Sequence, residues 1–193
     1  MRVKFAMIFS LILAACGTVA GGVSSVADLD LLARSIDAPR SDDGALTRDG
    51  RLLTYAAATL VVAEAASRRS LAPEDRRQLY DRLSFAAADI EKLAEADGEG
   101  YFIELDAQDP VTALADIIGD AATSRVIRIA TGGASLAGGK ELAQSSLTAR
   151  NVVTGVRRVG EDLKAGAIER DMAIRILRDR IVIALDRLKP ATA

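Results

Sequence analysis

The chain has 193 residues, a formal net charge of −2, no histidine, no tryptophan and a single cysteine. This length suggests one domain, or at most two small ones. Without histidine, no site can use imidazole as a base, proton shuttle or metal ligand, which excludes Ser-His and Cys-His catalysis and most zinc sites. One cysteine cannot form an internal disulfide framework. We therefore expect no enzyme, no metal site and no cofactor.

The first fifteen residues have the pattern of an export signal. Arg2 and Lys4 form a short positive region, and residues 5–15 form an apolar run that carries only Ser10. The run matches the hydrophobic region of a secretory signal peptide and is too short to cross about 30 Å of hydrocarbon as a helix. Residues 1–15 are therefore predicted to be a cleaved signal peptide.

The apolar run ends in Leu-Ala-Ala-Cys-Gly at residues 13–17, and here the sequence resembles a bacterial lipoprotein precursor. The resemblance covers residues 1–17. It implies cleavage before Cys16, a diacylglycerol on the Cys16 thiol and, in many members, an acylated amino end. Gly17 stands where an acidic residue would favour the inner membrane, so the resemblance implies an outer-membrane anchor facing the periplasm. The alternative is an ordinary signal peptide cut at an Ala-x-Ala-like site, with Cys16 incidental.

The composition of residues 16–193 predicts an all-α fold. Alanine, the strongest helix former, occurs 36 times in the chain, and there are only four prolines. We expect a lipidated end and flexible tether over residues 16–25, followed by a single bundle of about five or six helices over residues 26–193. Periodicity and capping signals place helices at residues 26–36, 46–70, 73–96, 109–129, 142–164 and 168–188.

Individual segments sharpen this prediction. Residues 52–63 carry no charge and are too few to cross a membrane, so they predict a buried core helix, with Glu64 and Arg68 as a supporting i,i+4 ion pair after it. Four glycines between residues 131 and 140 predict a break. A seven-residue repeat then predicts packing along a neighbouring helix, with Leu142, Ala149, Val156 and Leu163 on one position and Ser145, Val152, Val159 and Gly166 on another.

The last helix carries two apolar stripes. The first consists of Ile174, Leu177, Ile181, Ala184, Leu185 and Leu188, and the second, roughly opposite, of Ile168, Met172, Ile176 and Ile183. A surface helix has one apolar stripe, so two indicate contacts on both sides. Either this helix is central in the bundle, which the usual burial of apolar helices favours, or its second stripe binds another chain. The second stripe is therefore the candidate partner-binding site.

Charge is unevenly distributed along the chain. Residues 16–123 hold 20 acids and 10 bases, a net −10, whereas residues 124–193 hold 7 acids and 13 bases, a net +6. The basic half either meets an anionic partner or packs against the acidic half so that the two fields partly cancel, and we favour the second explanation. The basic half contains no aromatic residue on which bases could stack, so nucleic-acid binding is not expected.

Two segments approach known ligand-binding motifs without matching them. Residues 134–141 resemble a phosphate loop, but Ala134 replaces the opening glycine and Glu141 the hydroxyl residue. The acidic segment 97–109 lacks the ligand spacing of an EF-hand, which leaves only a looser calcium site as an alternative. A simpler prediction is an extended segment over residues 101–105 that tucks Phe102 or Ile103 into the core.

The leading hypothesis is a non-enzymatic bacterial envelope lipoprotein, held at the membrane through Cys16. It would be a helical scaffold or accessory subunit that binds another envelope protein or itself. The alternative is a periplasm-facing carrier of a small apolar ligand or lipid in a bundle cavity. A hydrolase that uses carboxylates or a Ser/Lys pair is disfavoured, because the commonest general base is absent.

Overall fold

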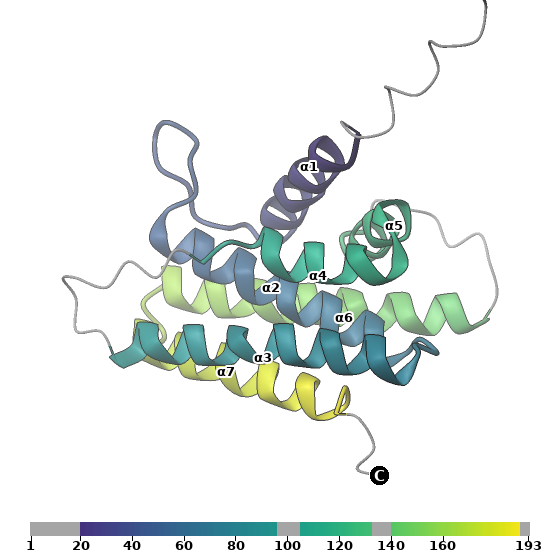
Figure 1. Ribbon diagram of the computed structural model, residues 1–193. Helices are drawn as coiled ribbons and strands as arrows, with labels where there is room; N and C mark the ends of the chain where they lie inside the picture. The colour runs from purple at the N-terminus through teal and green to yellow at the C-terminus, as the bar shows by residue number, and fades with distance from the viewer. Residues whose placement is uncertain (1–19, 96–104, 133–139, 190–193) are drawn as a thin grey trace, which may run out of the picture.

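The computed structural model describes residues 20–95, 105–132 and 140–189, and these residues form an all-α bundle (Figure 1). The predicted fold class is confirmed. Cys16, the predicted signal peptide before it and residues 101–104 lie outside the described residues. The described helices are α1 (Ala20–Ser35), α2 (Arg48–Ser67), α3 (Pro73–Glu95), α4 (Gln108–Ile118), α5 (Asp120–Ala130), α6 (Lys140–Lys164) and α7 (Arg170–Asp186).

Helix α2 is the centre of the bundle. It contacts each of the other six described helices and is buried without interruption from Leu52 to Ala66. Because its uncharged stretch has no polar face to turn to water, burial on all sides is the stable arrangement. The buried hydroxyls of Thr54 and Thr59 donate to backbone carbonyls one turn earlier, at 2.7 and 2.9 Å, so neither is left without a partner. The predicted buried core helix is confirmed.

The remaining helices surround α2. Helices α3 and α7 pack side by side on one side of it, and α1, α4 and α5 cover the other side, with α6 running along α2 and joining the two groups (Figure 1). The seam predicted for α6 is confirmed at its described positions from Ala149 to Leu163, but its last predicted position, Gly166, is exposed in the turn after the helix. Ala149, Val156 and Val159 are buried, and Val152 and Leu163 are partly buried against the core.

Helix α1 begins earlier than predicted. It starts at Ala20 instead of Val26, so residues 20–25 belong to a helix and the predicted tether over these residues is wrong. Small residues alone do not end a helix once it has formed, because nucleation is then complete and each further residue that is fixed adds one hydrogen bond. The helix is fixed to the bundle at its other end, where Leu32 and Ala33 are fully buried.

The single helix predicted over residues 109–129 is also wrong, because Gly119 divides it into α4 and α5. Gly119 has φ +84°, a conformation that residues with a side chain rarely adopt. Its N–H donates to Ala115 at 2.8 Å and its carbonyl accepts from Thr123 at 3.1 Å, so the chain turns with these backbone groups paired. The described residues therefore hold seven helices, where five or six were expected.

The two oppositely charged halves of the chain pack against each other. Among the described residues, five ion pairs join an acid of the first half to a base of the second. They are Asp28–Arg128 at 3.3 Å, Asp37–Lys164 at 3.9 Å, Asp49–Arg170 at 2.9 Å, Glu64–Arg187 at 3.0 Å and Glu91–Arg178 at 2.7 Å. These contacts support the favoured explanation of the charge asymmetry, in which the halves compensate each other.

Helix α7 lies at the periphery. It packs against α3, α2 and α6, and the six residues of its first stripe are all buried. The explanation favoured for its second stripe, a central position in the bundle, is wrong because α2 occupies the centre. The uncharged stretch of α2 can be buried on every side, whereas α7 carries exposed charges such as Asp179 and Asp186 that require contact with water.

Candidate functional site

The structure divides the four predicted partner-binding residues into two pairs. Ile168 and Ile176 are partly buried and pack against the core. Met172 and Ile183 are 48% and 57% exposed, which is unusual for large apolar side chains. The neighbouring Val182 is also exposed, although the stripe predicted from the sequence did not include it. The outer face of α7 therefore presents Met172 and Ile183 to solvent.

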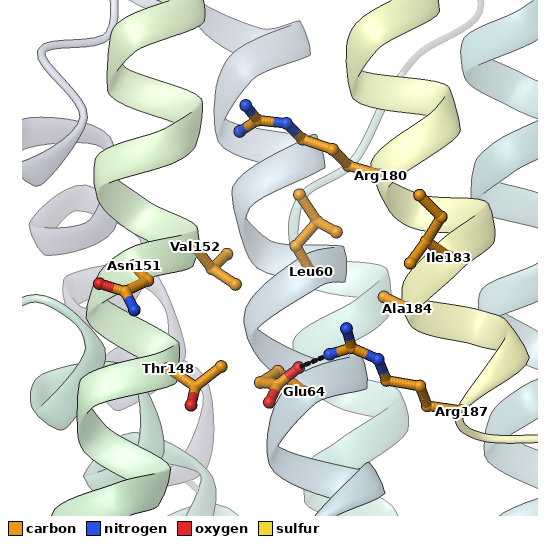
Figure 2. Close-up of a pocket in the computed structure, with 9 residues that line it drawn as sticks. All are labelled: Leu60, Glu64, Thr148, Asn151, Val152, Arg180, Ile183, Ala184 and Arg187. Atoms are coloured by element: carbon orange, nitrogen blue, oxygen red, sulfur yellow. Dashed lines mark hydrogen bonds and ion pairs between the residues drawn. The ribbon is translucent and has the colours of Figure 1, made fainter.

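Ile183 lines a groove between α6 and α7, with α2 as its floor (Figure 2). The groove has a volume of about 250 Å³ and opens to solvent. Its apolar lining comes from all three helices and its polar lining contains charges of both signs. The apolar residues are Leu60, Val152, Ile183 and Ala184, and the polar ones are Glu64, Thr148, Asn151, Arg180 and Arg187.

A buried carboxylate lies at one end of this groove. Glu64 is only 4% exposed, and each of its oxygens accepts from one guanidinium. Arg68 Nε lies 2.6 Å from Oε1. Arg187 Nη1 lies 3.0 Å from Oε2, as Figure 2 shows. A buried charge requires such compensation, because removal from water costs several kcal/mol per ion. The predicted Glu64–Arg68 pair is confirmed, and the Arg187 contact ties α7 to α2.

Arg180 lies at the other end of the groove (Figure 2). Its guanidinium lies over Gly155 of α6, where a Cβ atom would meet it. In the part of the chain that the structure describes, the Arg180 guanidinium makes no hydrogen bond or ion pair. Sequence analysis singled out neither residue, because the seven-residue repeat accounts for α6 without Gly155. An exposed guanidinium with no partner among the described residues therefore borders the groove.

A second hollow, between α3 and α4, is acidic. Asp89 and Asp109 line it beside Tyr55 of α2, and Phe85 is 68% exposed at its rim. Burial, and after it the charge of Asp106, raise the pKa of the Asp109 carboxyl. Burial, together with these three carboxylates, also raises the pKa of Tyr55. The negative charges of Asp89, Asp106 and Asp109 therefore repel one another in this hollow.

The acidic residues of the second hollow do not form a metal centre. In residues 20–95, 105–132 and 140–189, no three potential ligands converge closely enough to hold an ion. None of the helices in these ranges combines the length and hydropathy of a membrane span.

No protein-family model, curated protein or solved structure matches this chain. The functional argument therefore depends on the geometry of its own residues.

Proposed function

We propose that the chain is a bacterial envelope lipoprotein that binds another envelope protein through the outer face of α7. The observation that carries this proposal is the exposure of Met172 and Ile183 on a helix whose opposite side is fully buried. Methionine and arginine are enriched at protein interfaces. Met172 is exposed on α7, and Arg180 and Arg187 line the groove beside Ile183. Anchoring through Cys16 would confine the protein to a membrane surface, where other envelope proteins are concentrated.

A carrier of an apolar ligand is less well supported. The groove of about 250 Å³ falls below the roughly 300–1,000 Å³ that small-molecule sites occupy, and it opens to solvent. A protein partner needs no enclosed cavity, because one or two of its side chains can fill a shallow groove while the rest of the interface lies around it.

Replacement of the single cysteine tests the anchor. In Cys16→Ser, no thiol remains to receive a lipid, so we expect labelled palmitate to stay out of the protein and the precursor to remain unprocessed. Incorporation of label into Cys16→Ser at the natural level, or none into the natural protein, would contradict the lipoprotein assignment.

Charge substitution on α7 tests the binding surface. We expect the double variant Met172→Asp and Ile183→Asp to lose the protein that co-purifies from solubilised membranes, or to lose self-association in sedimentation. Both side chains are exposed, so the thermal midpoint should stay within a few degrees of the natural value. Phe85→Asp is the matched control, because Phe85 is also exposed but lies at the other hollow. Identical behaviour of the two variants would refute the proposed surface.

A further inference from the structure

The polar and apolar residues along the groove follow a helical spacing. Arg180, Ile183 and Arg187 stand at positions i, i+3 and i+7 of α7, and all three line the groove (Figure 2). Seven residues of an α-helix rise about 10 Å, so the backbone positions of the two arginines lie about two turns apart, on either side of Ile183. A second helix lying along the groove would present side chains at the same interval.

The groove retains an excess of positive charge. Arg68 and Arg187 share the single charge of Glu64, and Arg180 has no acidic partner in the described ranges. Carboxylates satisfy free guanidinium donors with strong, charge-assisted hydrogen bonds. The complementary ligand is therefore an anionic group on each side of an apolar one.

From this spacing and charge we propose that the groove receives an acidic amphipathic helix of the partner protein. An apolar side chain of that helix sits on Leu60, Val152 and Ile183, and acids seven residues apart meet Arg180 and Arg187. This inference rests on the proposed function, since it specifies the chemistry of the envelope partner. The small volume of the groove suits one or two side chains of such a helix.

An anionic bilayer fits the same face less well. Asp179 and Asp186 are 60% and 58% exposed on α7 and are paired with Arg178 and Lys189. Charges of both signs thus alternate along the helix, whereas a membrane surface attracts an uninterrupted cluster of lysines and arginines. Two acidic side chains at a fixed spacing on a partner helix match this mixed pattern of charges more closely than a bilayer does.

A synthetic peptide tests the proposal. An alanine-based helix carrying Glu-x-x-Leu-Leu-x-x-Glu places acids seven residues apart with leucine between them in either orientation. Titrated into the natural protein in mild detergent, the labelled peptide should bind. Arg180→Glu should weaken binding at least fivefold, and Arg180→Gln should weaken it less. Arg175→Glu is the matched control, because Arg175 also lacks a partner in the described ranges but does not line the groove.

Charge reversal in the peptide completes the test. Of two peptides in which either the first or the last Glu is replaced by Lys, one should regain binding to Arg180→Glu, and its identity gives the orientation of the helix. Equal weakening by Arg180→Glu and Arg175→Glu would overturn the proposal. Failure of the peptide to bind, with Arg180-dependent binding of soluble short-chain phosphatidylglycerol, would overturn it in favour of a lipid head group. If the Met172 and Ile183 double variant loses the co-purifying protein while Arg180→Glu retains it, this inference fails and the proposed function stands.

Discussion

The two hollows beside α2 differ in how their charges are balanced: the carboxylate in one is paired with arginines, and those in the other repel one another. Between α6 and α7, the buried Glu64 is paired with the guanidiniums of Arg68 and Arg187, and the Arg180 guanidinium has no partner in the described ranges. Between α3 and α4, carboxylates oppose each other, and Arg82, the arginine that lines this hollow, binds Asp116 instead. The first arrangement leaves no buried charge without a partner and leaves guanidinium donors for a binding protein, whereas the second becomes less favourable as its acids ionise.

Removing the compensation of Glu64 should have the largest effect. We expect the double variant Arg68→Ala and Arg187→Ala to lower the free energy of unfolding by about 3 kcal/mol, because it leaves a buried carboxylate without a partner. Urea denaturation measures this loss. Arg82→Ala is the control, since its partner Asp116 is 53% exposed and such pairs contribute about 1 kcal/mol or less. Equal losses in the two proteins would show that Glu64 gains its compensation elsewhere.

Gly155→Ala should separate stability from binding. Alanine in place of a mid-helix glycine stabilises by roughly 0.5–1 kcal/mol, and the new Cβ meets only the mobile end of Arg180. The variant should therefore unfold at higher urea concentration while it binds the acidic peptide more weakly, because the guanidinium is displaced. A loss of stability in this variant would mean that Arg180 cannot move aside.

The acidic hollow should respond to pH. Asp106→Asn keeps the oxygen that accepts from the Gln108 N–H but removes a charge, so the raised pKa of Asp109 should fall toward 3.8. Carboxyl-carbon NMR measures this change. Because the folded form binds more protons than the unfolded chain, stability is lost as pH rises from about 3.8 through the folded pKa.

The linked change in stability should be the smallest of these effects. Asp109 is only partly removed from water, so solvent screening limits the gain of Asp106→Asn to a few tenths of a kcal/mol at pH 7. The gain should vanish below pH 3.8, where Asp109 is protonated in both states. A gain that persists at low pH would assign the effect to something other than this charge.

Local pattern was sufficient to predict the interior of the bundle. The uncharged residues 52–63 indicated that α2 would be buried, and the first stripe of α7 indicated the side it would bury. Gly119 was missed because the apolar spacing from Val111 to Ala121 continues through it, and periodicity does not report a positive φ.

The groove could not be predicted from local pattern. Glu64 and Arg187 are 123 residues apart, and the contact of Arg180 with Gly155 exists only once α6 and α7 are packed. Periodicity gives the angle at which a residue leaves its helix but not whether a neighbour covers it. For that reason Ile168 and Ile176 are partly buried, whereas Met172 and Ile183 on the same predicted stripe are exposed.

Site-specific photo-crosslinking in living cells tests the central claim, that the outer face of α7 is the binding surface. A photoreactive residue is placed at position 183 in one protein and at position 85 in another, since both native side chains are exposed. The account predicts one discrete protein adduct from position 183 that Arg180→Glu diminishes, and no matching adduct from position 85. The same adduct from both positions, or none from position 183, would contradict it.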